Sequence, residues 1–472
     1  MRNLLISIFF LLIIENLPAQ QLRLPAYPAD SVRQGSRELF TELSRKHPGF
    51  YRYHAKAVMD AFVDSTLQTM RDSLTEVQIY RKLKPVFAKI GCLHTDISTS
   101  PAYQSWLKST NTLLPVRVLV QGQRAFITHN YSSDSTLLTG SELLAVNGVA
   151  TAAIIRQLMA AIPADGYNQS EKILLLQYNF ADWYRAICEV TERFHLLIRT
   201  GGMEKEYLLN GVNGTAFPVP AARQGERLRF QVRDSLAVLT IRSFAKSEIK
   251  AAGQHYKSFL RKAFKKLNTQ QVPCLVLDLR YNTGGTDARA ALLCSYLMNA
   301  PYRYWNRIEA TRAFAESIKG LAGLIYRKPV PTDSLYQWRK SRFTREFDFY
   351  EPQRPAKYNY TGKLFVLING LCLSSCGDLA AVLSHNKRAV FVGQETGGGY
   401  QGNTSGLMPV VELPTGLTVT VPLLKYTTAV DPGVNHGRGT MPDHPVVPTV
   451  QEVVEGTDAE MKYVLDLIHK KR

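Results

Sequence analysis

The sequence predicts an α/β protein in which a helical segment and a small α+β module precede a mostly parallel sheet covered by helices. From about residue 228 onward, strand-like runs alternate with helical patterns, as in "PCLVLDLR" followed by "DARAALLCSYLM". These runs are apolar on both faces, which is typical of parallel strands that lie between two layers of helices. Residues 36–90, in contrast, have the apolar spacing of helices. Because 472 residues are many for one hydrophobic core, we expect two or three domains.

The first twenty residues, "MRNLLISIFFLLIIENLPAQ", have the pattern of a secretory signal peptide. Arg2 precedes an apolar core over residues 4–14, and a small residue typical of a signal-peptide cleavage site follows at Ala19. That core is shorter than the roughly 20 apolar residues of a spanning helix, and no later run approaches this length. No cysteine lies near this cleavage site, so we expect no lipid anchor. We therefore expect residues 1–20 to be removed and the mature chain to be exported to the periplasm or the cell exterior, without an integral membrane segment.

Residues 21–110 are expected to form an N-terminal helical domain. Three helical patterns follow one another: "LFTELSRKHPGFY", "AVMDAFVDSTLQTM" and "TEVQIYRKLKPVFAKI". Thr75, Glu76 and Gln78 provide an N-terminal cap for the third helix.

Residues 111–222 change to short alternating strands and contain "GSELLAVNGVATAAIIRQLM", which reads as a strand, an Asn-Gly turn and a helix. This segment resembles PDZ-like modules, which bind extended peptides by adding a strand to a sheet edge. An ordinary α+β subdomain without a ligand fits the segment equally well. Residues 223–472 then form the α/β domain, in which functional residues are expected at the carboxyl ends of the strands.

The excess of basic residues does not indicate a nucleic-acid partner. The formal net charge is +18, but the basic residues are scattered and the chain has no groove-reading motif. The cluster "KSFLRKAFKK" over residues 257–266 is better explained as an amphipathic surface helix. The charge favours anionic surfaces or acidic substrates.

The six cysteines give no zinc-type pattern. Cys372 and Cys376 are four residues apart, but no histidine or second pair completes a metal set, so we interpret them as structural thiols. Export permits disulfides, and the pairing is left open.

Three segments place reactive or permissive residues at the end of a strand or helix. In "LVLDLRYNTGGTDAR", Gly284 and Gly285 leave backbone N–H groups free to hold an oxyanion. Equally, the turn from a strand to a helix could need glycines only because a side chain would not fit there. In "NGLCLSSCGD", Ser374 and Ser375 lie between a predicted strand and a predicted helix. A serine nucleophile needs a base within hydrogen-bond reach, which neither neighbour supplies.

The third segment, "AKIGCLHTDISTS", places His94 in a turn just past a helix end, before a probable strand. A lone histidine is more often a satisfied polar residue than a base. Composition does not choose among His94 and the other histidines, which include His47, His385, His436 and His444.

Taken together, "LVLDLRYNTGG", "LFVLINGLCLSSCGDLAAVLSHNKRAVFVGQETGGG" and "GRGTMPDHPVVPT" resemble the tail-specific protease domain of the S41 serine peptidases, in particular the tricorn-like branch. "AKIGCLHT" and "GSELLAVNG" also match that group. The resemblance implies a ClpP/crotonase-like α/β protease core and no metal or organic cofactor. It places Ser374 on the nucleophile and His94 on the general base. It also places Ser375, with Gly284 or Gly285, on the oxyanion hole.

Two positions depart from the family pattern. Related C-terminal processing peptidases have a lysine base where this chain has Gly399, so a Ser-Lys dyad at that place is excluded. The position of the tricorn-like glutamate is occupied by His436, and the residue beside the base is Leu93 instead of serine. Asp431 is the remaining candidate for the group that orients the base.

The resemblance therefore implies an exported serine peptidase that acts on proteins or peptides through a Ser-His acyl-enzyme mechanism. Two other readings stay open. One is a non-catalytic relative that binds lipophilic ligands, as repeats of interphotoreceptor retinoid-binding protein do, and the other is a peptide-binding chaperone. The sequence does not determine the oligomeric state.

Overall fold

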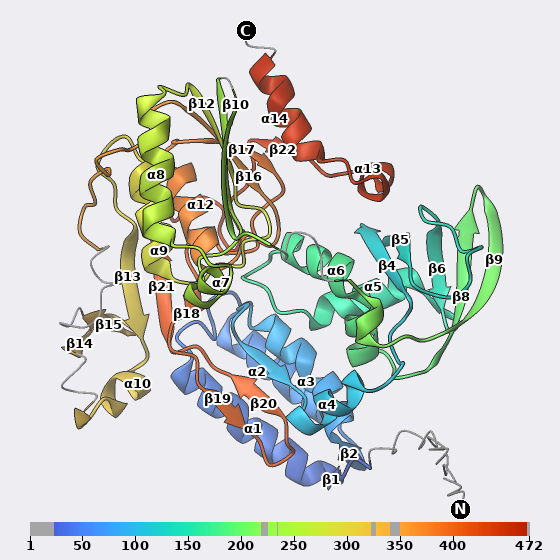
Figure 1. Ribbon diagram of the computed structural model, residues 1–472. Coiled ribbons are helices and arrows are strands. Elements are labelled where there is room, and N and C mark those ends of the chain that lie inside the picture. Colours follow the sequence, from blue (N-terminus) through green and yellow to red (C-terminus); the bar gives the residue numbers. More distant parts are fainter. Residues whose placement is uncertain (1–22, 219–224, 234, 322–326, 340–349, 470–472) are drawn as a thin grey trace, which may run out of the picture.

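The computed structural model describes residues 23–218, 225–233, 235–321, 327–339 and 350–469 (Figure 1). The predicted signal peptide, residues 1–20, lies outside the described residues. Within them, the chain is a mixed α/β protein with several sheets, which confirms the predicted class at that level. The domain boundaries near residues 110 and 222 stay predictions.

Helices dominate the first described segment. Its elements are β1 (Ala26–Pro28), α1 (Ala29–Lys46), α2 (Lys56–Gln68), β2 (Ser73–Thr75), α3 (Glu76–Lys89), β3 (Asp96–Ser98) and α4 (Pro101–Lys108). Helix α3 begins where predicted, because the Thr75 hydroxyl accepts from the Gln78 N–H and the Gln78 side chain accepts from the Thr75 N–H. The antiparallel pair β1 and β2 was not expected, because three residues are too few to show the alternation of a strand.

The next segment forms an antiparallel sheet with two helices. It comprises β4 (Val116–Gln121), β5 (Arg124–Asn130), β6 (Glu142–Val146), β7 (Val149–Ala150), α5 (Thr151–Ala161), α6 (Ser170–Ile187), β8 (Arg193–Thr200), β9 (Met203–Asn210) and the 3₁₀ turn Gly214–Ala216. The strand order is β4-β5-β6-β8-β9, so β4 is an edge strand. Asn147 and Gly148 reverse the chain between β6 and β7 with positive φ angles of 49° and 77°, as the Asn-Gly turn predicts.

A mostly parallel sheet forms the centre of the remaining chain. Its strands and the helices between them are β10 (Leu228–Arg233), β11 (Leu236–Ile241), α7 (Lys246–Ala251), α8 (Tyr256–Thr269), β12 (Cys274–Asp278), α9 (Asp287–Leu297), β16 (Lys363–Ile368), α12 (Ser375–His385), β17 (Val390–Gly393) and β22 (His444–Pro445). The strand order is β10-β11-β12-β16-β17-β22. Strand β10 pairs antiparallel with β11, and the other pairs are parallel.

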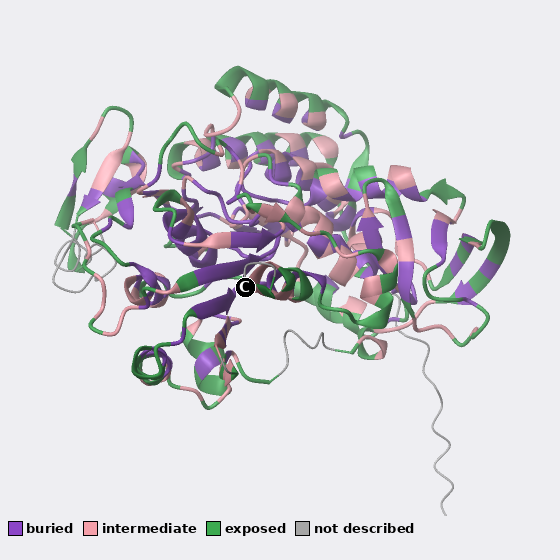
Figure 2. Cartoon of the chain, turned by 90° about the horizontal axis from the view of Figure 1, so that it is seen from above, coloured by how far each residue is buried: buried purple, intermediate pink, exposed green. Residues whose placement is uncertain are grey.

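Both faces of this sheet are buried, as the apolar strands predict (Figure 2). Leu275 and Leu277 of β12 pack in the cluster that contains residues of α8, α9 and α12. Val276, between them, points to the opposite face and packs with Val464 of α14 (Ala459–His469). Alternate residues of one strand therefore fill two separate cores.

A second sheet lies beside the first and has the order β14-β15-β13-β21-β18. Its strands are β13 (Trp305–Ala310), β14 (Arg327–Pro331), β15 (Tyr336–Arg339), β18 (Thr404–Ser405) and β21 (Leu424–Thr428), and the short helices α10 (Arg312–Ser317) and α13 (Val450–Glu455) belong to the same half of the chain. Between β18 and β21, the hairpin of β19 (Val410–Glu412) and β20 (Thr418–Thr420) reaches back to the N-terminal segment. There β20 pairs antiparallel with β3, with Val419 opposite Ile97.

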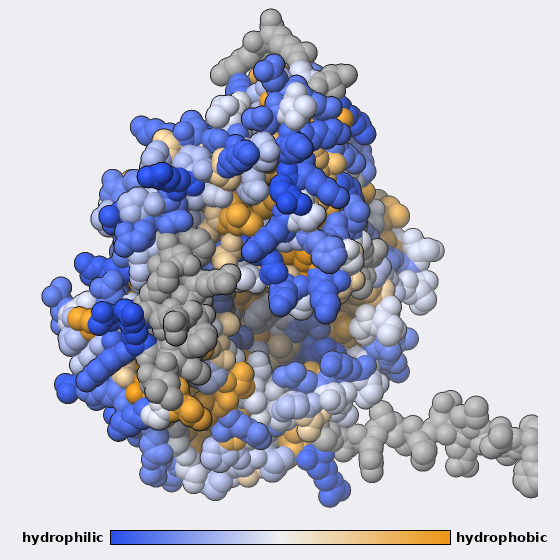
Figure 3. All heavy atoms as spheres, turned by 60° about the vertical axis from the view of Figure 1, so that its left-hand side comes forward, coloured by the Kyte–Doolittle hydropathy of each residue, from blue (hydrophilic) through white to orange (hydrophobic). Residues whose placement is uncertain are grey.

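The basic run predicted as a surface helix is α8. Its buried residues are Tyr256, Leu260, Ala263, Phe264 and Leu267, so the basic side chains occupy the other side of the helix. The face shown in Figure 3 is largely hydrophilic, with apolar side chains gathered in patches. Among the described residues, no helix is long and apolar enough to cross a membrane.

Candidate active site

Ser374 lies in the tight turn between β16 and α12, as the apolar runs on either side predict. Its backbone has φ 51° and ψ −131°, a conformation that residues with a side chain seldom adopt. The residue directly before α12 is Ser374 itself, so the N–H of Ser375 belongs to the first turn of the helix. Strained residues of this kind are held by their surroundings and are frequent at functional sites.

The glycine loop after β12 presses against this turn. A Cβ atom on Gly284 would lie 2.8 Å from Ser374 Cβ and 3.2 Å from the Ser375 nitrogen. The N–H of Gly284 is already used, since it donates to Asn282 Oδ1 at 2.9 Å. In the described part of the chain, the N–H groups of Gly285 and Ser375 have no such acceptor. These two N–H groups are therefore the ones free to hold an oxyanion.

His94 lies in the loop between α3 and β3 and is half-buried. Its Nδ1 atom is inaccessible to solvent and has no hydrogen-bond partner among the described residues. Burial lowers the pKa of His94 to about 4, although the Thr404 backbone opposes this effect. The imidazole is therefore neutral at pH 7 and has a lone pair that can accept a proton.

Asp165, which the sequence did not single out, holds the His94 loop in place. Its Oδ1 accepts from the Leu93 N–H and its Oδ2 from the Gly399 N–H, each at 3.1 Å. Burial raises the pKa of Asp165 to about 6, although these two N–H groups oppose the shift. No pattern in "IPADGYN" marks this aspartate, because its partners come from two distant parts of the chain.

Packing connects the His94 loop with the Ser374 turn. Leu93 packs against the cluster that contains Leu371 and Leu373 of the turn. The segment with Gly398 and Gly399 also contacts the Ser374 turn, because a Cβ atom on Gly398 would lie 3.1 Å from the Ser374 nitrogen. The next residue, Gly399, donates its N–H to Asp165. Within the described residues, no hydrogen bond joins Ser374 to His94. Hydrogen bonds between catalytic groups often tighten only when substrate binds.

The structure places Asp431 elsewhere. This exposed residue accepts from the Gly433 N–H at 2.8 Å, and its own N–H donates to His385 Nδ1 at 3.3 Å. None of its hydrogen bonds in the described chain reaches His94, so the geometry gives no support to the predicted orienting role. His436, also exposed, contacts Gln401 Oε1 through Nδ1 at 3.2 Å.

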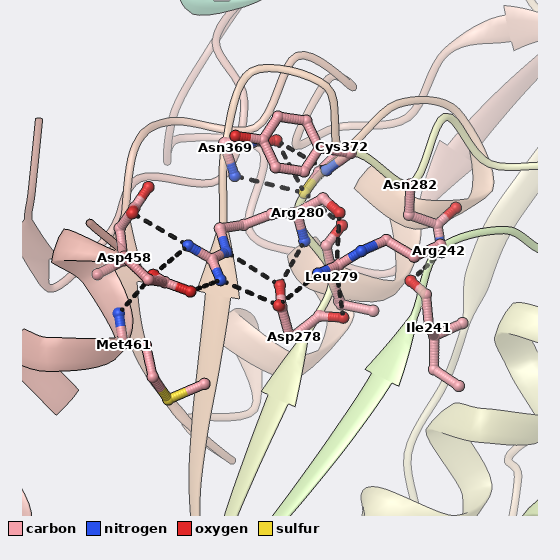
Figure 4. Close-up of polar contacts among 12 residues, drawn as sticks. Ile241, Arg242, Asp278, Leu279, Arg280, Asn282, Asn369, Cys372, Asp458 and Met461 are labelled. Atoms are coloured by element: carbon pink, nitrogen blue, oxygen red, sulfur yellow. Dashed lines mark hydrogen bonds and ion pairs between the residues drawn. The ribbon is translucent and has the colours of Figure 1, made fainter. Parts of the chain in front are cut away.

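An ion-pair network anchors the start of the glycine loop (Figure 4). The Arg280 guanidinium contacts Asp278 and, on α14 and the residue before it, Glu460 and Asp458, at 2.7–3.0 Å. Burial acts to raise the pKa of Asp278, but Arg280 and Arg242 outweigh it and lower that pKa to about 2. Asp278 and Arg280 therefore form a structural ion pair.

A groove of about 1150 Å³ opens at the carboxyl ends of the parallel strands. Edge strand β4 and helix α6 form one side, and Arg280, Tyr281 and Asn369 line the sheet side. Neither Ser374 nor His94 lines it, but Tyr281 and Asn369 belong to the loops that lead to Gly284 and Ser374.

Three residues of the site form a set that could hold a metal ion. One ligand atom each of Cys92, His94 and Asp165 lies within 4.8 Å of the others. All six cysteines lie in the described part of the chain and are free thiols, so no disulfide competes for Cys92. This metal set could not be predicted, because Asp165 is far from Cys92 and His94 along the chain.

Residues 235–446 match the family model described as Peptidase family S41, so this part of the chain is an S41 peptidase domain. No curated protein sequence matches the chain. Among solved structures, mature CPAF in complex with lactacystin is similar, with a TM-score of 0.64, 15% identity and coverage of 93% of this chain and 97% of that chain. Mature CPAF alone gives a TM-score of 0.62 with 14% identity, covering 92% of this chain and 95% of that chain. At 14–15% identity, these similarities show a shared fold only.

Proposed function

We propose that the chain is an exported serine peptidase that hydrolyses peptide bonds through an acyl-enzyme on Ser374. The single observation that carries this proposal is the contact between the Ser374 turn, with its positive φ, and the glycine loop at Gly284. That contact brings a hydroxyl and unused backbone N–H groups to one place, which is what acyl transfer requires. The predicted signal peptide supports the exported location.

In the first half of the reaction, neutral His94 takes the proton of the Ser374 hydroxyl while Oγ attacks the carbonyl carbon of the scissile bond. The N–H groups of Gly285 and Ser375 donate to the oxyanion that forms. Protonated His94 then gives its proton to the leaving amine, the C–N bond breaks and an ester remains on Ser374. In the second half, His94 takes a proton from water while the water oxygen attacks the ester carbon, and it then returns this proton to Ser374 Oγ as the C–O bond breaks and the carboxylic acid product leaves.

We assign Asp165 a positioning role in this reaction. It fixes the backbone of Leu93, next to the base, and that of Gly399, next to the nucleophile turn, with two hydrogen bonds. One buried carboxylate thus keeps two separate loops in register. It takes the orienting role that the sequence suggested for Asp431.

The substrate is expected to bind as an extended peptide along β4, in line with the PDZ-like resemblance of this segment. Strand β4 is at the edge of its sheet, and it lines the groove together with α6. Backbone groups of an edge strand are available for pairing with an added strand. Tyr281 and Asn369, which line the groove, belong to the loops that lead to Gly284 and Ser374, so a peptide in the groove could continue toward Ser374.

The test is hydrolysis of an unstructured protein by the mature chain and by its Ser374→Ala variant. Ser65→Ala, on the exposed surface of α2, is the matched control. We expect Ser374→Ala to lose activity and Ser65→Ala to keep it, and undiminished hydrolysis by Ser374→Ala would contradict the proposal. A serine-reactive phosphonate should label the parent chain at Ser374, whereas a non-catalytic binding protein would remain unlabelled.

A further inference from the structure

The loop that carries His94 also brings together three side chains of the kinds that bind transition metals. Cys92, His94 and Asp165 each place a ligand atom within 4.8 Å of the other two. Cys92 and Asp165 are both 3% exposed, so these ligands are largely shielded from water. The cluster lies on two loops that hydrogen bonds already hold together, because Leu93, between Cys92 and His94, donates to Asp165.

The donor types favour Zn²⁺. A thiolate, an imidazole and a carboxylate are its usual protein ligands, and a site with three of them leaves a fourth position for water. Ca²⁺ and Mg²⁺ prefer oxygen ligands, so sulfur and nitrogen disfavour them. The two anionic ligands would also balance the charge of a divalent ion in this buried place.

A second, independent observation points to a ligand at the same place. The buried Nδ1 atom of His94 has no hydrogen-bond partner in the described chain. An unpaired polar atom away from water is costly, and a metal ion would remove that cost. Each oxygen of Asp165 accepts only one backbone N–H, so each has a lone pair left for a metal. Those hydrogen bonds also fix the carboxylate, as the outer contacts of metal sites commonly do.

We propose that Cys92, His94 and Asp165 bind one Zn²⁺ ion, which reversibly inhibits the peptidase. Binding forms bonds from the metal to sulfur, nitrogen and oxygen, and the Cys92 thiol releases its proton to solvent, with no change of oxidation state. The inhibitory part rests on the proposed function of His94, whereas the binding part does not.

Inhibition follows from the chemistry of the imidazole. A neutral imidazole has one nitrogen with a free lone pair, and the other nitrogen holds the proton. Once the metal occupies that lone pair, the ring has no site left to take the proton of Ser374, whichever nitrogen binds the metal. The metal therefore competes directly with general-base catalysis.

Binding is tested without relying on catalysis, in the mature chain with Ser374→Ala. Co²⁺, which occupies zinc sites and absorbs light, is titrated into this protein, and Zn²⁺ is then added. We expect a thiolate-to-cobalt charge-transfer band that saturates at one equivalent and disappears when Zn²⁺ displaces Co²⁺. Absence of a thiolate band in this folded protein would overturn the proposal.

Variants assign the ligands. Cys92→Ser should lose the thiolate band, and His94→Ala should weaken Zn²⁺ binding by at least the roughly 10- to 100-fold known for outer contacts of metal sites. Cys188→Ser, which changes a partly exposed thiol elsewhere, is the matched control and should bind as the parent does. A band that persists in Cys92→Ser or vanishes in Cys188→Ser would overturn the assignment. Since His94 is less buried than Cys92, its variant keeps the test valid if Cys92→Ser does not fold.

Activity separates the two proposals. If the proposed function holds, Zn²⁺ should abolish hydrolysis by the parent chain and a chelator should restore it. Metal binding with no hydrolysis at any Zn²⁺ concentration would count against the proposed function alone. Full hydrolysis with the site saturated by Zn²⁺ would overturn the inhibitory role.

Discussion

Gly284 lies so close to Ser374 that a methyl group on the glycine would come within 2.8 Å of the serine Cβ atom. The same methyl group would meet the Leu373 carbonyl oxygen at 2.8 Å, and the glycine has φ 93°. Both the space and the backbone conformation therefore require glycine here.

Gly284→Ala should lower kcat/KM about 100-fold, because a displacement of the reacting groups by about 1 Å has an effect of that size. Gly140→Ala is the matched control, since Gly140 also has positive φ, 83°, but a Cβ atom there would meet nothing within 4 Å. Both variants should lose about 1–2 kcal/mol of stability from the backbone conformation. Equal activity of the two variants, measured by peptide hydrolysis, would show that the contact with Ser374 does not matter.

The pH dependence of kcat/KM should reflect the low pKa of His94. The base must be neutral to accept a proton, and burial lowers the pKa of His94 to about 4 from the usual value near 6.5. Titration of His94 itself should therefore lower activity only as the pH approaches 4, whereas a decrease near pH 6 would come from protonation of Asp165, because burial raises the pKa of Asp165 to about 6.

The fold must be followed in the same experiment. Burial lowers the pKa of both His94 and His47 in the folded chain, so the unfolded chain takes up protons first as the pH falls. These two histidines should thus contribute less stability below about pH 6.5, whereas the raised pKa values of the buried carboxyl groups Asp165, Glu171 and Asp378 act in the opposite direction. Circular dichroism at each pH separates unfolding from titration. An acid limb near pH 6.5 that persists in folded Asp165→Asn, which cannot titrate at that position, would contradict the assigned environment of His94.

Asp165→Asn should reduce kcat more than it changes KM. An amide has one acceptor oxygen, so either the Leu93 or the Gly399 N–H loses its partner, at a cost of about 1–3 kcal/mol. Since both loops flank the reacting groups, we expect a loss of about 100-fold in kcat and a shift of the acid limb of the pH profile. Asp134→Asn is the control, because the partly exposed Asp134 accepts from Thr136 through one oxygen, Oδ1, which asparagine retains. A purely structural role for Asp165 would lower stability without moving the pH profile.

Arg280→Met should destabilise the fold by about 3–5 kcal/mol, the usual result of removing one partner from a buried ion pair. Glu460 would lose its ion-pair partner, and Asp278 would keep only Arg242. Arg312→Met, at an exposed pair with Glu316, should cost about 0–1 kcal/mol. Urea unfolding of both variants measures the difference, and a cost for Arg280→Met no greater than that for Arg312→Met would refute the anchoring role.

Much of the architecture could be predicted because its signals are local. Strands apolar on both faces indicated the parallel sheet, and the run from β16 to α12 showed where Ser374 would lie. The Thr75 cap and the Asn147 turn were visible in the same way, since each depends on residues within a few positions of one another. The short strands β1 and β2 carry too few residues to give such a signal.

The arrangement around His94 could not be predicted, because it depends on contacts between distant segments. Asp165 meets Leu93 and Gly399 only after the chain folds, and nothing near it in the sequence shows this. Asp431 was suggested by its place near the expected family position, but the structure puts it against His385. Proximity in sequence was a poor guide to proximity in space at this position.

The pairing of β20 with β3 determines at which stage of synthesis the candidate active site can form. During synthesis β3 and the His94 loop emerge early, the Ser374 turn much later, and β20 later still. Until β20 arrives, the segment that follows His94 lacks the strand that pairs with it, so a growing chain contains His94 and even Ser374 without a finished site. Closure between such remote segments is slow compared with local folding. Proteolytic activity is thereby deferred until the chain is almost complete.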